Sequence, residues 1–202
     1  MGGLEAVEDG EVEGLVAAAA EAMSHAAEAL SALLGVSVRP GPPQVTRLPA
    51  ASAARTLREA PVVETALYFS VGGDPEGALL VFFPPGRARA LAFRLTGQPE
   101  AGAGIPGGRE GSALKEAGNI LASAYLSVAS RWAGVALKPS VPHLAPDWGR
   151  AVADGALHGL FPAAGTVLLA EVPFGDDRLV RGRVIWLPGT RTRGGLTRGH
   201  GD

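Results

Sequence analysis

The sequence predicts an α+β fold, within the broad α/β class, that is internally duplicated and packs two long helices on a mixed, largely antiparallel sheet. Residues 11–34 and residues 111–132 each gather apolar side chains on one face at about 100° per residue, the period of a helix. The stretch from Gly35 to Pro43, after the first helix, aligns without a gap on Gly134 to Pro142, and the offset is 99 at both ends (134 − 35 and 142 − 43). A repeat of this length predicts one pseudo-symmetric domain with an approximate two-fold axis.

The first repeat, about residues 11–96, begins with the first long helix. Gly35 follows Leu34 and is the residue type most common just after a helix C-terminus. Three prolines in the next segment confine it to a sheet edge or a bulge, and the turn-rich sequence GGDPEG predicts a hairpin between two strand-like runs. The expected elements are a helix at 11–34, an extended segment at 36–48, a short helix or loop at 49–59, hairpin strands at 62–71 and 78–83, and a helix at 84–96 that has proline near its first turn.

The second repeat, about residues 112–188, follows the same order. Its expected elements are a helix at 111–132, an extended segment at 135–144, a short helix at 148–157, and hairpin strands at 166–172 and 181–187. A glycine-rich linker, about residues 97–111, joins the repeats. The domain is therefore expected to span residues 11–188, between a flexible N-terminus at 1–10 and a disordered basic tail at 189–202.

Bulk composition limits the classes of function. A chain of 202 residues suffices for a sizeable core, and its net charge of −2 and pI of about 6.1 give no electrostatic case for nucleic acid or an anionic membrane surface as partner. The absence of cysteine excludes disulfides and thiolate chemistry. The acidic start lacks the pattern of a signal peptide, and no apolar run approaches the roughly 20 residues of a membrane span, so a cytoplasmic location is expected.

A polar stripe on the second long helix carries the candidate site. At the helical period, six residues fall opposite the apolar face: Ser112, Glu116, Asn119, Ser123, Ser127 and Ser130. The stripe is expected to be an exposed, flat surface against which another macromolecule can lie while the longer Glu116 and Asn119 reach into it. The offset of 99 places Ala17 and Ala20 at the equivalent positions of the first helix, which would keep its fold but lack the two polar groups.

Other motifs give no support for a cofactor or a metal. The glycine clusters lack the Lys-Ser or Lys-Thr of a phosphate-binding loop, and glycines 102–108 suit a linker better than a nucleotide site. The four histidines do not have metal-ligand spacing. Of these, His143 stands beside Pro142 and is the one near the proposed site. No metal site and no cofactor of the chain's own are therefore expected.

The pattern of Ser112, Glu116, Asn119 and Pro142, with twenty-two residues between the last two, resembles the signature of the CheC/CheX/FliY phosphatases of bacterial chemotaxis. The run LKEAGNILASAYLSVAS at 114–130 is similar to the second motif helix of that family, and AAEALSALLG at 26–35 is similar to the first. The resemblance covers roughly residues 11–188. CheC-type members carry the motif twice, so the alanines in the first helix imply a CheC-like protein with a degenerate first motif and one active site.

The resemblance implies a phosphatase that removes the phosphoryl group from the aspartyl phosphate of a CheY-type response regulator. Asn119 would orient the attacking water, and Glu116 would pair with a lysine of the regulator. Four further residues would contact the substrate protein: Ser112, Ile120, Ser123 and Pro142. The receiver domain of the regulator would bring its own Mg²⁺. Ile120 and Leu126 flank the stripe, where they either pack at the docking surface or rim the core.

Two alternatives remain open from the sequence. The same fold family includes flagellar switch components that bind CheY or neighbouring subunits without hydrolysis, and CheC proteins bind the receptor deamidase CheD. The chain is therefore also compatible with a non-catalytic binding module for a response regulator, CheD or a motility-switch component. The response regulator could also belong to a pathway other than chemotaxis.

Overall fold

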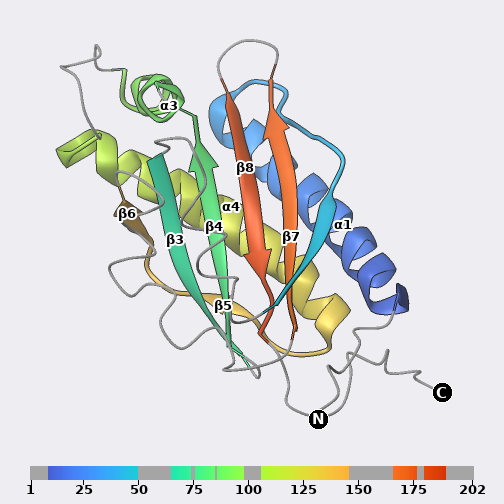
Figure 1. Ribbon diagram of the computed structural model, residues 1–202. Coiled ribbons are helices and arrows are strands. Elements are labelled where there is room, and N and C mark those ends of the chain that lie inside the picture. Colours follow the sequence, from blue (N-terminus) through green and yellow to red (C-terminus); the bar gives the residue numbers. More distant parts are fainter. Residues whose placement is uncertain are drawn as a thin grey trace.

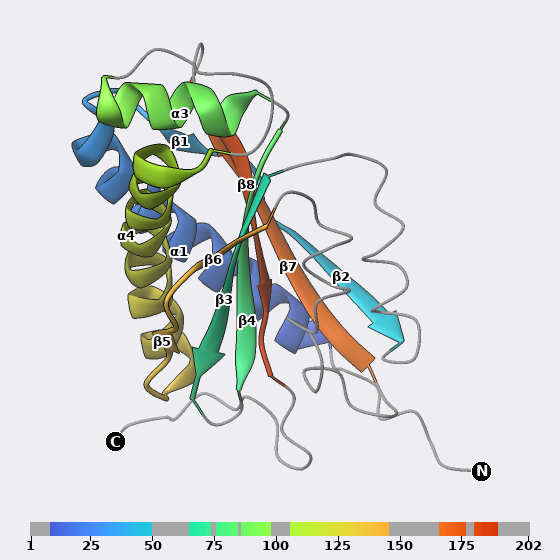
Figure 2. The same ribbon diagram turned by 90° about the vertical axis from the view of Figure 1, so that its left-hand side faces the viewer.

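Two long helices cover one face of an eight-stranded sheet, and a third helix lies across one end of the pair (Figures 1 and 2). The computed structural model describes residues 9–49, 65–73, 76–84, 86–97, 106–145, 166–176 and 180–189. The long helices are α1 (Asp9–Leu34) and α4 (Gly108–Ala133), and the shorter one is α3 (Arg87–Thr96). This arrangement confirms the predicted fold of two helices side by side on one face of a sheet.

The strands are β1 (Arg39–Pro40), β2 (Gln44–Pro49), β3 (Thr65–Gly72), β4 (Gly77–Phe83), β5 (Lys138–Pro139), β6 (His143–Ala145), β7 (Thr166–Gly175) and β8 (Arg181–Leu187). Their order is β1-β7-β8-β4-β3-β5, while β2 also pairs with β7 and β6 also pairs with β3. Every pair among the described strands is antiparallel. The two hairpins, β3–β4 and β7–β8, are the ones predicted from the sequence.

The repeats exchange the segments that follow their long helices. The first repeat's β1 and β2 pair with β7 of the second repeat, and the second repeat's β5 and β6 pair with β3 of the first. Equivalent residues make equivalent pairs, since Arg39 lies opposite Gly175 as Lys138 lies opposite Gly72. Each half therefore completes the sheet of the other, which explains why the two repeats form one domain.

A pseudo-two-fold axis passes between the central strands β4 and β8. Leu80 pairs with Tyr68 in the first hairpin as Ile185 pairs with Glu171 in the second, so Leu80 and Ile185 are equivalent. These two residues also face each other directly across β4 and β8, as residues on a two-fold axis must. The offset between equivalent residues is 105 for β4 and β8 (185 − 80) and 103 for β3 and β7 (171 − 68). The offset of 99 therefore holds only for the long helices and the segments that follow them. Connections between elements tolerate such changes in length.

The chain leaves both long helices in the same way. Gly35 and Gly134 have φ of 65° and 68°, the left-handed conformation that glycine adopts without strain. The hydroxyl of Ser31 then accepts a hydrogen bond from the Val38 N–H at 2.9 Å, and the hydroxyl of Ser130 accepts one from the Leu137 N–H, also at 2.9 Å. Ser130 is therefore half-buried and structural, whereas the sequence placed it on the exposed stripe.

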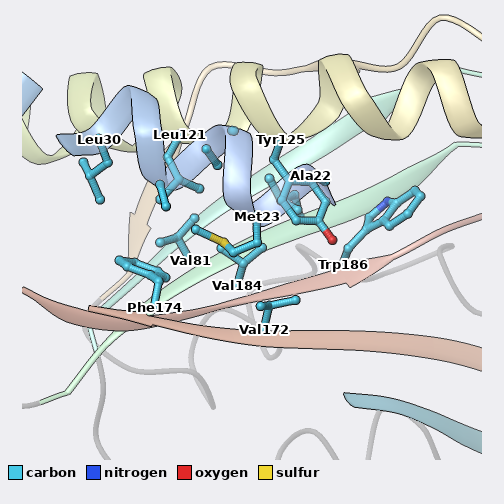
Figure 3. Packing of buried hydrophobic residues seen from close by; sticks show 14 of the residues in the cluster. Ala22, Met23, Leu30, Val81, Leu121, Tyr125, Val172, Phe174, Val184 and Trp186 are labelled. Atoms are coloured by element: carbon cyan, nitrogen blue, oxygen red, sulfur yellow. The ribbon is translucent and has the colours of Figure 1, made fainter. Parts of the chain in front are cut away.

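The main core lies between the helices and the sheet, where Met23 of α1 and Tyr125 of α4 point toward the strands (Figure 3). A second cluster on the other face of the sheet is also buried and includes Tyr68, Leu80, Phe82 and Ile185. The helix α4 begins at Gly108, inside the segment expected to be a linker, because Arg109 and Glu110 are good helix formers that can extend its first turn. The short helices expected near 49–59 and 148–157 and both chain termini lie largely or wholly outside the described residues.

Candidate functional site on helix α4

The motif turn, from Glu116 to Asn119, lies on the outer face of α4, away from the sheet. Between its two polar residues, Ala117 and Gly118 point inward and are buried. Glu116 is exposed and Asn119 is half-buried. Among the described residues, neither side chain has a hydrogen bond or an ion pair. This confirms the outward orientation that the helical period predicted, with Asn119 less exposed than expected.

One side of α4 packs against α1, which runs in the opposite direction. Near the N-terminal end of α1, a Cβ added at Gly14 would lie 3.3 Å from Cζ2 of Trp132, in the last turn of α4. Further along, Glu21 and Arg131 form a salt bridge at 3.1 Å. The C-terminal end of α1 therefore lies nearest the part of α4 that carries the motif turn.

The other side of α4 faces the return segment, residues 137–144, which runs back along the helix. One end is fixed where Ser130 binds the backbone of Leu137. At the other end, a Cβ added at Gly111 would lie 3.5 Å from Cδ2 of Leu144. Asn119 is eleven residues before Ser130, or about 20° away around the helix, so it points to the same side. Asn119 therefore points to the side of α4 along which the return segment runs.

Pro142 belongs to the return segment and is buried. It precedes Leu144 by two residues, which in an extended chain is about 6–7 Å, so it stands roughly one helical turn from Gly111 toward the motif turn. A bulge holds the proline in place, because the Ser140 N–H donates to the Ser70 carbonyl at 2.8 Å and the Ser70 N–H donates to the Ser140 hydroxyl at 3.1 Å. The structure thus brings Pro142 beside the helix that carries Glu116 and Asn119.

His143, the histidine singled out beside Pro142, belongs to the other face of the sheet. Its ring lies 6.4 Å, centroid to centroid, from the ring of Tyr68. Tyr68 is part of the buried cluster on the face away from the helices, whereas its neighbours Leu67 and Phe69 pack under α4. His143 is therefore separated from the motif turn by the edge of the sheet.

The remaining predicted contact residues differ in exposure. Ser112 and Ser123 are exposed on the side of Asn119, and the Ser112 hydroxyl donates to the Gly108 carbonyl at 3.0 Å within its own helix. Ile120 is half-buried on the side facing α1. Leu126 is only 1 % exposed and belongs to the core, so the idea that it packs at a docking surface is wrong. The wheel position of Leu126 borders the stripe, but the side chain packs into the main core.

The equivalent turn of α1, Ala17 to Ala20, has the same burial pattern. Ala17 is exposed, the two following alanines are buried and Ala20 is half-buried, as in the motif turn. The first repeat also has the bulge, because the Gly41 N–H donates to the Pro173 carbonyl at 2.7 Å. The first repeat therefore keeps the scaffold of the site without its two polar side chains.

Within the described residues, the acidic and histidine side chains do not form a group of three or more that could hold a metal ion. No helix in the described part of the chain is long and apolar enough to cross a bilayer. Burial raises the pKa of the Tyr68 and Tyr125 hydroxyls above the usual 10.0. Both tyrosines lie in the buried clusters rather than in the motif turn.

Comparisons with known proteins relate the chain to others by structure. No family model matches it. No curated protein sequence matches it. Among solved structures, FliY of Thermotoga maritima has a TM-score of 0.65 at 17% identity, and the match covers 91% of both chains. CheX of Desulfovibrio desulfuricans has a TM-score of 0.56 at 14% identity, covering 86% of this chain and 100% of CheX.

A third relative in structure is the FliM middle domain of H. pylori, with a TM-score of 0.64 at 11% identity, covering 91% of this chain and 94% of that one. FliM–FliG and FliM–SpeE complexes of H. pylori match as well. At these identities the matches establish the fold. The chain has the fold shared by the FliY, CheX and FliM structures.

Proposed function

We propose that this protein is a phosphatase of the CheC type, which hydrolyses the aspartyl phosphate of a CheY-type response regulator at a single site, the motif turn of α4. One observation carries the proposal: Glu116 and Asn119 stand on the outer face without partners among the described residues, while Pro142 is held beside the helix by a bulge. With Ser112, which is exposed on the same helix, these are the four residues of the pattern that resembles the phosphatase signature.

The chemistry requires little from the phosphatase. Water attacks phosphorus, the bond between phosphorus and the aspartyl oxygen breaks, and the products are inorganic phosphate and a free carboxylate. Phosphoryl transfer depends mostly on positioning and charge stabilisation, and the receiver domain would bring its own Mg²⁺ and lysine. The amide oxygen of Asn119 accepts a hydrogen bond from the attacking water and does not titrate, so it can hold the water in line with the bond that breaks.

Glu116 has a different role in the proposal. It lies three residues before Asn119, just under one helical turn, so both side chains enter the same site of the regulator. Its carboxylate pairs with the lysine of the receiver and fixes how α4 docks. Ser112 and Ser123 leave room for the partner on either side of the pair, and Ile120 and Pro142 border the contact. The substrate also implies a cytoplasmic location.

A second candidate is a non-catalytic binding module. The FliM structures of H. pylori that share the fold include complexes with FliG and with SpeE, which favours protein binding as a use of this fold. In that case the partner would be a response regulator, CheD or a motility-switch component. The two polar side chains of the motif turn favour the phosphatase, because a surface that only binds has no need of both Glu116 and Asn119.

The test is phosphate release from a phosphorylated CheY-type receiver domain with Mg²⁺, with and without this protein. The matched control is the double variant Glu116→Ala/Asn119→Ala, which should fold normally because both side chains lie on the outer face. Faster release with the wild type than with the double variant is the expected result. If phosphate is released at the spontaneous rate with both proteins and the receiver still binds, the phosphatase proposal is wrong and the binding module is supported.

A further inference from the structure

Gly118 lies inside the motif turn and faces the sheet. It is buried between Ala117 and Asn119, directly above Leu67 and Phe69 of β3. A Cβ at this position would overlap Cδ1 of Leu67, and it would lie 3.4 Å from Cζ of Phe69 and 3.6 Å from Cγ of Leu67. At the motif turn, α4 therefore lies too close to β3 for a residue with a Cβ, unless the Leu67 side chain or the helix shifts.

The two strand side chains cannot easily move away. Leu67 and Phe69 are both fully buried in the core between helices and sheet. Protein interiors are packed at the density of organic crystals, so an added methyl group at Gly118 would shift either a packed side chain or the helix. The helix is the element with a free side, because its outer face at this turn is open to solvent.

In the first repeat, different residues occupy the equivalent positions. The equivalent of Gly118 is Ala19, since 118 − 99 is 19, and the equivalents of Leu67 and Phe69 are Ala170 and Val172, since 67 + 103 is 170 and 69 + 103 is 172. All three of these residues are fully buried in the same core. In the half without the polar pair, the helix carries alanine over small strand side chains, and in the half with the pair it carries glycine over large ones.

We infer that Gly118 is a positioning residue. It sets the distance between α4 and β3, and it thereby holds Glu116 and Asn119 in the position that hydrolysis needs. This inference rests on the proposed function. Glycine in the middle of a helix is unfavourable relative to alanine, so its presence here calls for a local packing reason, which the contact with Leu67 provides. A misplacement of about 1 Å can slow an enzyme by ~100-fold, so a shift of the helix would affect catalysis more than binding.

The experiment compares Gly118→Ala with the double variant Gly118→Ala/Leu67→Ala, which installs the residue pair of the first repeat. Gly118→Ala should lower kcat for phosphate release about tenfold or more and change KM by less than about threefold. The double variant should recover most of the rate. The matched control is Gly14→Ala, which adds a methyl group against Trp132 at the opposite end of the helix pair and should leave the rate unchanged.

A second readout separates this inference from the phosphatase proposal. The NMR signals of the Asn119 side-chain amide should shift in Gly118→Ala and return in the double variant, whether or not the protein has activity. If wild type does not accelerate phosphate release, the proposed function fails, and the Asn119 amide signals alone then show whether the substitution moves the turn. Unchanged signals and rate in folded Gly118→Ala, or an equal loss in Gly14→Ala, would overturn the inference. If Gly118→Ala does not fold, a fast double variant supports it and a folded but slow one overturns it.

Discussion

The first-repeat turn at Ala17 and the motif turn at Glu116 differ in chemistry and agree in structure. Each turn lies on a helix that is followed by a glycine with positive φ. In each helix, a serine hydroxyl near the C-terminus binds the backbone that follows, and the segment after the helix has a bulge. Their burial patterns match residue for residue through the turn. The comparison shows that the fold depends on these backbone features and not on the Glu and Asn side chains, which the first repeat lacks.

The core beneath the two helices is less symmetric than the backbone. Met23 and Ala26 of α1 correspond to Ala122 and Tyr125 of α4, since 122 − 23 and 125 − 26 are both 99. All four are fully buried. Tyr125 also packs edge to face on Trp186, with ring centroids 6.0 Å apart (Figure 3). A large residue in one repeat is thus matched by a small one in the other, which keeps the combined volume close to constant near the axis.

A combined loss of activity and affinity is expected from Glu116→Ala. The carboxylate is proposed to pair with a receiver lysine that is already present in the ground-state complex, so activity and affinity should fall together. We expect kcat/KM to fall on the order of 100-fold, or ~2.7 kcal/mol, with a measurable rise in Kd for the phosphorylated receiver. Phosphate release and titration of the receiver measure the two quantities. Full activity in this variant would remove Glu116 from the site.

Ser130→Ala and Ser31→Ala test whether the two repeats are equivalent in stability but not in function. Each change removes the acceptor of one backbone N–H, that of Leu137 or Val38, and should lower the free energy of unfolding by about 1–2 kcal/mol. Urea denaturation should give similar losses for both. Phosphate release should slow in Ser130→Ala, whose return segment flanks Asn119, and stay near wild type in Ser31→Ala. Equal slowing in both would show that stability, and not position, causes it.

Tyr125→Phe tests the asymmetric core. The buried Tyr125 hydroxyl has no hydrogen-bond partner among the described residues, so its removal should change the free energy of unfolding at pH 7 by less than about 1 kcal/mol or increase it. A loss above about 2 kcal/mol, measured in urea, would mean that the hydroxyl has a partner.

The same substitution should change stability at alkaline pH. Burial raises the pKa of Tyr125, so above pH 10 the unfolded chain releases this proton before the folded protein does. The folded state then holds more protons, and stability falls as pH rises, by up to about 1.4 kcal/mol per pH unit from this one group. Tyr125→Phe removes this contribution, so its stability should decline less steeply between pH 10 and 11. Identical slopes would contradict the account.

The smallest effect is expected in the first repeat. Replacing Ala17 or Ala20 with serine adds one hydroxyl to the outer face of α1 and should leave phosphate release within about twofold, well below 1 kcal/mol. Neither alanine can orient water or pair with a lysine, so the change should not affect the reaction at the motif turn. A large loss of activity from either substitution would show that α1 takes part in the reaction.

Local patterns in the sequence predicted the elements, and long-range contacts explain what they missed. Period and turn chemistry located both long helices, α3 and the two hairpins, because these signals depend on neighbours in the chain. The offset of 99 predicted the pseudo-symmetry. It could not show that β1 and β2 join β7, because strand pairing across more than a hundred residues leaves no local pattern.

For the candidate site too, local patterns predicted some features and missed those that depend on long-range contacts. The helical period placed Glu116 and Asn119 on the outer face. It misplaced Ser130, whose hydroxyl binds the backbone of the return segment, and it left open whether Leu126 belongs to the core. The packing of Gly118 on Leu67 joins α4 to a strand about fifty residues earlier, and only the three-dimensional contact gives that glycine a role.

The central claim, that the motif turn catalyses hydrolysis, is tested most directly by measuring both phosphate release and receiver binding for Asn119→Ala. Because the side chain is not part of the core, stability should change by no more than about 0.5 kcal/mol. If Asn119 orients the attacking water, release should slow on the order of 100-fold or more, or ~3 kcal/mol of barrier, while the Kd for the phosphorylated receiver changes little. If wild type and Asn119→Ala bind the receiver equally and neither exceeds the spontaneous rate of release, the claim is contradicted and the protein is a binding module.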